Sequence, residues 1–215
     1  MGRRLAGLWL ILVAVALAAG CAAPRFTYIA DTSASTYFKV PYGWQKVDDS
    51  ALFTALNGGR SASAPSGLWS VGYDAAAVPD AKHVLSPAVT HPFVLGLVVP
   101  LSASARASLT DERLADFFLP VTPAARQSAA LQGFPLTGFR LLRDNLVTAS
   151  QGIHGVKVIF DYRYPDHHVD TFGQVALTNP GKSEVYVLLV HCTATCYSQH
   201  LSQINTVMSS FTVRS

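Results

Sequence analysis

Charged side chains are scarce in this 215-residue chain, at 13% of the residues, while half of the residues are hydrophobic. The chain has 16 Lys and Arg against 13 Asp and Glu, and apart from Arg3 and Arg4 the cations are scattered singly. Binding to nucleic acid needs a positive stripe that neutralises phosphates. We therefore exclude nucleic acid as a partner and expect one domain with a sizeable apolar core.

Glutamate is nearly absent, because only Glu112 and Glu184 occur. This leaves few candidates for the paired carboxylates of acid–base catalysis. The chain also lacks a Gly-x-Ser-x-Gly elbow, a His-Glu-x-x-His helix, a P-loop and a Gly-x-Gly-x-x-Gly turn. We therefore expect no enzyme and no cofactor, although a hydrolase triad assembled from distant residues stays open.

The apolar run at the start of the chain is shorter than the roughly 20 residues that cross a bilayer as a helix. It extends from Leu5 to Ala19 behind Arg3 and Arg4, which is typical of a secretory signal. It leads into Leu17-Ala18-Ala19-Gly20-Cys21, which resembles a bacterial lipobox. The resemblance implies a signal peptide over 1–20 and a lipid such as palmitate on Cys21. It places the protein at the cell membrane, facing outside the cytoplasm. Secretion with a free Cys21 and an uncleaved anchor are the alternatives.

The rest of the chain divides into a short tether and one domain. Small and polar residues dominate 21–36, which predicts a tether. The domain is expected over 37–215, where turn residues separate apolar segments. Its expected strands are 68–73, 93–99, 139–149, 156–164, 169–178 and 185–191, and its expected helices are 51–56, one after Thr110 with Leu114, Phe117 and Phe118 on one face, and one from about 194.

Hydrophobic periodicity indicates how these segments are buried. The alternation over 156–164 predicts a strand with one buried face. The segment 185–191 is apolar on both faces, and we expect it inside the sheet. In the last helix, Leu201, Ile204, Met208 and Phe211 are expected to face the core, with Val207 beside them. The sequence therefore predicts an α+β fold in which helices flank an antiparallel sheet.

The two ends of the domain resemble those of PsbP-like domains. The residues that carry the likeness are Phe38-x-Val40-Pro41-x-Gly43-Trp44 at the start, and Ile204 with Ser210-Phe211 at the end. Actinobacterial lipoproteins of this type also join a signal, a lipobox and a short tether to one such domain. The resemblance implies an α/β/α sandwich and carries over no catalytic residue. It implies a role in protein interaction or as a scaffold, since members include photosystem accessory proteins and a Ran-binding import factor.

Cys192 and Cys196 form an even pair of thiols in a chain that we expect to be exported, which favours a disulfide. One tight turn between them would bring the Cα atoms within the roughly 4.4–6.8 Å that a bridge requires. Zinc bound by these thiols with His191 and His200 is an alternative, and buried free thiols are another.

A second group of metal-capable residues is Asp166, His167, His168 and Asp170. It lies at an expected hairpin tip, where polar residues occur without any function, so we predict a solvated turn and no metal site. The single residues His83, His91 and His154 are expected to be structural or exposed.

Taken together, these features predict a lipid-anchored envelope protein with a non-catalytic interaction or scaffold domain. Its partners would be the membrane, through the lipid on Cys21, and an unknown envelope protein or apolar ligand. A carrier of an apolar small molecule is the first alternative and a hydrolase the second. The loops 58–67 and 78–92 are the expected interaction surface, because loops vary while a core is constrained.

Overall fold

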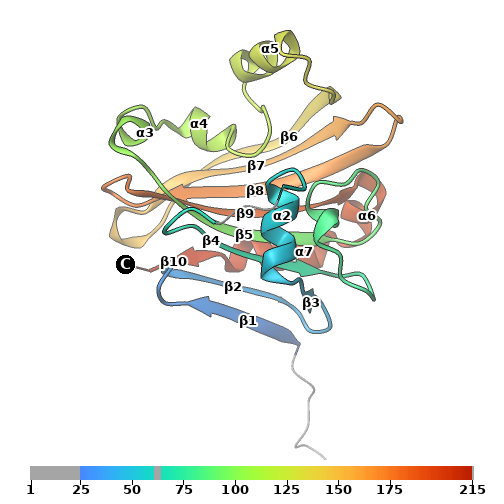
Figure 1. Cartoon of the computed structure of the whole chain (residues 1–215), viewed down its shortest axis with the longest axis horizontal. Coiled ribbons are helices and arrows are strands. Elements are labelled where there is room, and N and C mark those ends of the chain that lie inside the picture. Colours follow the sequence, from blue (N-terminus) through green and yellow to red (C-terminus); the bar gives the residue numbers. More distant parts are fainter. Residues whose placement is uncertain (1–24, 61–63, 215) are drawn as a thin grey trace, which may run out of the picture.

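The computed structural model describes residues 25–60 and 64–214. The strands form two sheets in which every pairing is antiparallel (Figure 1). A small sheet has the order β1-β2-β10, with β1 Phe26–Asp31, β2 Thr36–Pro41 and β10 Thr212–Val213. A seven-stranded sheet has the order β3-β4-β5-β9-β8-β7-β6, with β3 Gln45–Lys46, β4 Trp69–Asp74, β5 Phe93–Pro100, β6 Thr137–Thr148, β7 His154–Arg163, β8 Val169–Thr178 and β9 Glu184–Thr193.

Short helices occupy the connections and the chain's last segment. They are α2 Asp49–Leu56, α3 Ala103–Ala107, α4 Asp111–Ala115, α5 Pro123–Leu131, α6 Ala194–Gln199 and α7 Leu201–Ser210, with 3₁₀ turns η1 Ala81–Val84 and η2 Ser150–Gly152. Side-chain oxygens cap several of them. Asp48 accepts from the backbone N–H of Ala51 at the start of α2, and Thr110 accepts from that of Arg113 at the start of α4.

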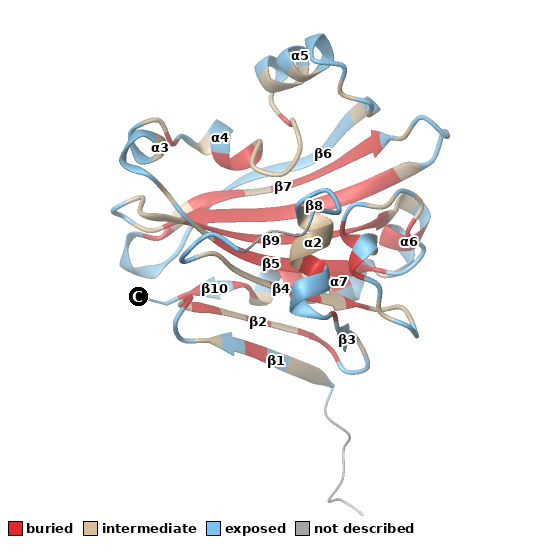
Figure 2. Cartoon of the chain, viewed as in Figure 1, coloured by how far each residue is buried: buried red, intermediate tan, exposed pale blue. Residues whose placement is uncertain are grey.

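The large sheet separates two hydrophobic cores. Buried residues are concentrated on the central strands of this sheet (Figure 2). On one face, Leu52 of α2, Val84 of η1 and Leu114 of α4 pack against strand residues. On the other face, Ile204 and Val207 of α7 share a core with residues of β1 and β2. The predicted α+β class with an antiparallel sheet flanked by helices is confirmed. The small sheet was not predicted. The layer that covers this second face of the large sheet therefore consists of α7 together with the small sheet.

The centre of the large sheet agrees with the sequence pattern. Strand β5 pairs with β9 along the whole length of β5, from Phe93↔His191 to Pro100↔Glu184. Both are buried on both faces. Apolar residues on both sides of a strand are stable only where both faces are covered, so these two segments could be placed in the interior from sequence.

Strand β7 is buried on both faces, which corrects the expectation of one buried face. The face expected to be solvated carries Lys157, Asp161 and Arg163, and of these Asp161 is buried, only 2% exposed. Its Oδ2 accepts from Nε and Nη2 of Arg140 on β6, and its Oδ1 accepts from the hydroxyl of Thr171 on β8. A carboxylate with these partners can be buried, and alternation alone does not reveal such partners.

The tether expected over 21–36 is wrong from Phe26 onward, because β1 lies within it. β1 pairs with β2 along its whole length, from Phe26↔Pro41 to Asp31↔Thr36. Ile29 is buried in the core that contains Phe38 and Val40. Phe26, Tyr28 and Ile29 are residues that favour strands, but the small and polar residues over 30–36 led to the expectation of a tether.

The last helix is also corrected, because it is divided at His200 into α6 and α7. Leu201, expected in the core, is 46% exposed, whereas Ile204, Met208 and Phe211 are buried as expected. Leu201 is the first residue of α7, so its side chain lies at the end of the helix, where periodicity alone does not ensure burial. Similarly, α4 ends at Ala115, and Phe117 and Phe118 lie beyond it, half-buried.

Candidate functional site

The position of α2 on the sheet is set by a glycine. A Cβ at Gly72 of β4 would lie 3.1 Å from Cζ of Phe93 and 3.2 Å from Cδ2 of Leu52. Because Gly72 has no side chain, the buried Leu52 brings α2 close to the sheet. The remaining residues of α2 are only partly covered, and they form the walls of surface hollows on both sides of the helix.

Two of these hollows adjoin each other through Leu85, which is 44% exposed and lines both. The first has a volume of about 440 Å3 and lies between α2 and the segment after α4, lined by Phe53, Leu56, Asn57, Pro65, Leu68, Leu85, Leu97, Phe117 and Phe118. The second, of about 540 Å3, lies between α2 and η1, lined by Ser50, Ala51, Thr54, Ala55, Gly59, Asp80, Ala81, Lys82, Leu85, Ser86 and Pro87. We call the two together the α2 groove. Its residues include members of both predicted loops, 58–67 and 78–92.

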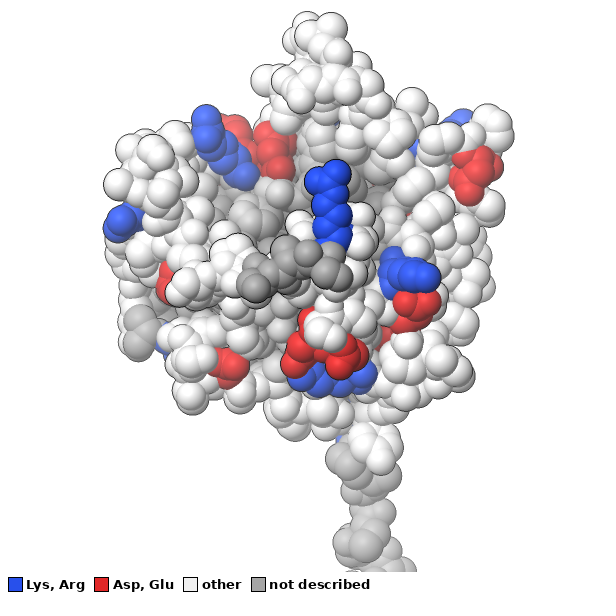
Figure 3. Space-filling view, viewed as in Figure 1, with Lys and Arg blue, Asp and Glu red and all other residues white. Residues whose placement is uncertain are grey.

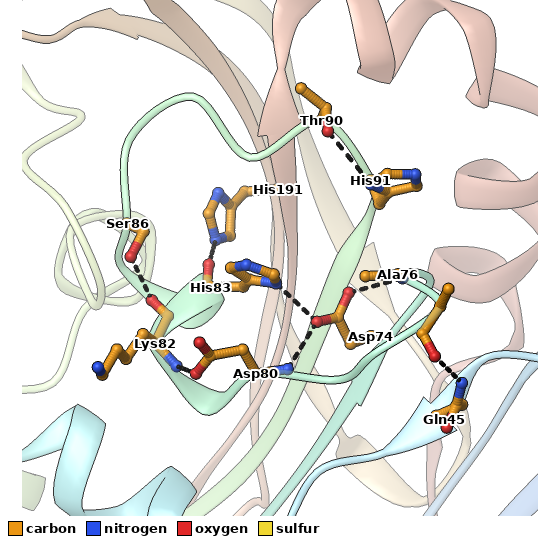
Figure 4. Close-up of polar contacts among 11 residues, drawn as sticks. Gln45, Asp74, Ala76, Asp80, Lys82, His83, Ser86, Thr90, His91 and His191 are labelled. Carbon is orange, nitrogen blue, oxygen red and sulfur yellow. Dashed lines mark hydrogen bonds and ion pairs between the residues drawn. The ribbon is translucent and has the colours of Figure 1, made fainter.

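The wall of the groove at η1 is held by a buried carboxylate (Figure 4). Asp74, at the end of β4, has no exposed surface. It accepts hydrogen bonds from the backbone N–H groups of Ala76 and Asp80, at 2.9 and 3.1 Å, and contacts Nδ1 of His83 at 2.7 Å. These contacts fix the start of the loop 75–92 and of η1 against the sheet.

His191 of β9 fixes the same wall from beneath. Its Nε2 lies 2.6 Å from the carbonyl oxygen of His83. Its ring stacks on Phe172, with centroids 5.2 Å apart. Burial lowers the pKa of His191 to about 4, so the ring is neutral at pH 7 and Nε2 donates to the carbonyl. His83 and His191 therefore both hold the loop 75–92 in place. Their wide separation in the sequence gave no indication of this relationship.

The Asp74–His83 pair has the geometry in which a carboxylate orients an imidazole for base catalysis. The His83 side chain is 32% exposed, so the ring is not sealed from solvent. A hydrolytic triad would also need a nucleophile hydrogen-bonded to this ring. Within the described residues the ring contacts Asp74 alone by hydrogen bonding, and the pair serves as a structural support for the groove.

The structure brings Cys192 and Cys196 together, with Cα atoms 5.9 Å apart and the sulfurs at disulfide distance. A bridge between them would join the end of β9 to the first turn of α6. His191 faces the opposite side of β9 and contacts His83 and Phe172 there. His200 instead contacts Oε1 of Gln203 through Nδ1. The four residues of the zinc alternative thus do not converge.

The second metal-capable group is divided by the hairpin. Asp166 and His168 are exposed at the tip, with Oδ2 and Nδ1 3.0 Å apart, as a solvated turn predicts. Asp170 is fully buried in β8, close to the backbone of Ala88. In the described part of the chain, no three His, Cys, Asp or Glu residues are placed to share a metal ion. The isolated His91 and His154 contact Thr90 and the carbonyl of Gly152.

The proposed lipid site, Cys21, and the signal over 1–20 lie outside the described residues. Every helix within residues 25–60 and 64–214 is too short or too polar to cross a membrane. On the face that carries α2, charges of the two signs are interspersed and separated by wide uncharged areas (Figure 3). This face, as far as it is described, offers no continuous basic stripe.

No protein-family model matches the sequence, and no curated protein does so. Solved structures with a similar arrangement include cyanobacterial PsbP (CyanoP) from Synechocystis sp. PCC 6803, with 13% identity over 91% of this chain and 96% of that chain and a TM-score of 0.48. LpqN of Mycobacterium tuberculosis, involved in cell envelope biogenesis, has 14% identity over 89% and 91% and a TM-score of 0.49. The Ran-binding protein Mog1p of Saccharomyces cerevisiae has 11% identity over 89% and 96% and a TM-score of 0.48. These likenesses concern the fold and do not establish a family, so the function is argued from the chain's own residues.

Proposed function

We propose that this protein is a lipid-anchored component of the cell envelope that binds an extended segment of another envelope protein in the α2 groove. The observation that carries the proposal is the pair of adjoining hollows that share Leu85. A polypeptide places side chains at regular intervals, so two neighbouring apolar hollows suit successive anchors of one chain. The fixed wall at η1 supports binding, because a site that is already ordered loses less entropy.

The nature of the groove distinguishes this proposal from the small-molecule carrier. A carrier would enclose most of its ligand's surface in one cavity. Both hollows here open to the surface, and Leu85 divides them. The inner faces of the sheet, by contrast, are filled by buried side chains such as Phe93, Phe160 and Leu189. The open hollows at the surface and the filled interior also support a binding role without catalysis.

Site-specific photocrosslinking in intact cells tests the proposal. A photoreactive amino acid at position 85 should form adducts with a polypeptide, whereas one at position 131 should not. Leu131 is the control because it is 85% exposed and lies on α5, away from the groove. Leu56→Glu, which places a charge in the first hollow, should remove the adduct formed at position 85 while the protein stays folded by circular dichroism.

Two results would contradict the proposal. Identical polypeptide adducts from positions 85 and 131 would show that crosslinking reflects collision and not binding in the groove. An adduct at position 85 whose added mass is that of a small apolar molecule would establish the carrier instead.

A further inference from the structure

The outer face of the small sheet differs from the rest of the surface in its composition. The register Tyr28↔Lys39 and Ala30↔Tyr37 places these residues, with Phe26, on one side of the sheet. Alternate residues such as Ile29 and Phe38 point to the core. The outer face thus carries three aromatic rings, and no Asp or Glu occupies an outward position in the described strands β1, β2 and β10.

Two cations lie over these rings. Nζ of Lys39 is 4.4 Å from the centroid of the Phe26 ring, and Cζ of Arg214 is 5.0 Å from that of Tyr37. Tyr28 itself is 75% exposed, and none of the ring or cation contacts among the described residues involves it. Tyr28 is thus exposed, while Phe26 and Tyr37 are half-buried. Aromatic rings with interspersed Lys and Arg at a protein surface are typical of surfaces that lie at the level of lipid headgroups.

One end of the small sheet carries a further exposed tyrosine, in the turn after β2 and beside the point where the described chain begins. The backbone N–H of Tyr42 donates to the carbonyl oxygen of Arg25 at 2.9 Å. Tyr42 is 65% exposed, so a second free tyrosine lies beside the first described residue. At about 3.5 Å per extended residue, the five steps from Cys21 to Phe26 span at most about 18 Å. A lipid on Cys21 would therefore hold this end of the domain at the membrane.

A polar hollow adjoins the outer face on its α7 side. It has a volume of about 720 Å3 and is lined by Lys39 together with Ser202, Asn205 and Ser209. Leu201, the residue that was expected in the core and is exposed instead, also lines it. Hydroxyl and amide groups beside an ammonium group suit the phosphate of a lipid headgroup, and an exposed Leu suits the acyl boundary.

We propose that the outer face of the small sheet, with Tyr28, Tyr42, Lys39 and Arg214, lies on the surface of a membrane that contains anionic lipids. This inference rests on the proposed lipid anchor at Cys21 and adds to it an orientation. The small sheet and α5 lie at opposite ends of the molecule (Figure 1). With the small sheet on the bilayer, α5 points away from the membrane and the α2 groove opens to the side, where a partner can reach it.

Cysteine accessibility in the full-length, membrane-attached protein tests this orientation. Tyr28→Cys and Tyr42→Cys are reacted with a membrane-impermeant maleimide, once in isolated membranes and once after solubilisation in detergent. Each cation near an anionic surface contributes about 1 kcal/mol. Lys39 and Arg214 together thus predict protection on the order of thirtyfold in membranes. Leu131→Cys, at 85% exposure on α5, should react equally fast in both states.

A charge variant makes the test specific. Lys39→Glu in the Tyr28→Cys background should raise the labelling rate in membranes, whereas Arg106→Glu on the exposed part of α3 should leave it unchanged. Equal labelling of Tyr28→Cys in membranes and detergent, for protein that sediments with membranes, would overturn the orientation and leave the anchor intact. Wild-type protein that does not sediment with membranes would overturn the anchor and the orientation together.

Discussion

Nδ1 of His83 lies 2.7 Å from Oδ2 of Asp74, although the two residues belong to a loop turn and to a strand end. The contact joins η1 to β4 across the start of the loop 75–92. The same carboxylate receives the N–H groups of Ala76 and Asp80. One buried side chain thus determines the shape of the groove wall that Leu85 and Pro87 share.

Asp74→Ala should lower the free energy of unfolding by about 2–4 kcal/mol. The substitution leaves buried donors unpaired, and each unpaired donor costs about 1–3 kcal/mol. Urea unfolding followed by fluorescence measures the change. Asp49→Ala is the matched control, because Asp49 pairs with Lys46 at the surface and should contribute less than about 1 kcal/mol. Equal effects of the two substitutions would contradict a structural role for Asp74.

Asp170 predicts a pH dependence of stability. The residue is fully buried, and no described donor meets hydrogen-bond geometry with either carboxylate oxygen. Burial raises the pKa of Asp170 to about 6, against an opposing effect from the backbone N–H of Ala88. Between the unfolded pKa of about 4 and pH 6, the folded state holds the extra proton. Its contribution is therefore favourable at low pH and is lost as the pH rises through 6.

His191 predicts a pH dependence of stability of the opposite sign over nearly the same pH range. Burial lowers its pKa to about 4, so between pH 4 and 6.5 the unfolded state binds the extra proton and stability rises with pH. In the wild type the two slopes oppose each other between pH 4 and 6. Asp170→Asn should remove one of them, and chemical unfolding at several pH values should then show stability rising steadily from pH 4 to 6.5.

At pH 7 and above, Asp170→Asn should stabilise the fold by on the order of 1–3 kcal/mol, because it removes an unpaired buried charge. Asp166→Asn is the control, since Asp166 is exposed at the hairpin tip. A pH profile that is unchanged by Asp170→Asn would show that this carboxyl is solvated in the folded protein.

Gly173→Ala should destabilise the packing of the last two helices on the sheet. A Cβ at this position would overlap the Tyr197 hydroxyl and lie 2.8 Å from Sδ of Met208. Overpacking of this kind costs about 1–3 kcal/mol. Gly181→Ala is the matched control, because its nearest neighbour would be 4.0 Å away and it has no positive φ. Thermal unfolding that does not separate the two variants would count against close packing at Gly173.

The bridge between Cys192 and Cys196 predicts a mass difference. The intact mass of the purified protein should increase by two hydrogen atoms on reduction, and peptide mapping should assign them to this pair. Retention of both thiols in the free form, with stoichiometric zinc, would favour the metal alternative.

Cys21→Ala should prevent lipid attachment and release the protein from membranes or leave it unprocessed. Fractionation of cells and labelling with a fatty-acid analogue measure the two effects, and Cys192→Ala serves as the control that keeps Cys21. A Cys21→Ala variant that is processed and retained like the wild type would disprove the anchor.

The elements predicted best from the sequence are those whose burial needs no polar partner. Segments 93–99 and 185–191 are apolar on both sides and lie at the centre of the sheet as β5 and β9. The strand 156–164 was predicted in place, but its second buried face was not, because Asp161 is neutralised by Arg140 of another strand. The loops 58–67 and 78–92 were predicted as the interaction surface and both contribute to the α2 groove, while that assignment awaits the crosslinking test.

Local sequence by itself determined the positions of most strands, the helix caps at Asp48 and Thr110, and the closeness of Cys192 to Cys196, because these depend on neighbours within a few residues. Tertiary structure decided what depends on distant partners. It placed β1 in a sheet, broke the last helix at His200, buried Asp170, and joined Asp74 to His83 and His191. A buried polar side chain is stable only with the partners or the packing that the fold supplies, and a single sequence contains no signal for contacts between residues so far apart.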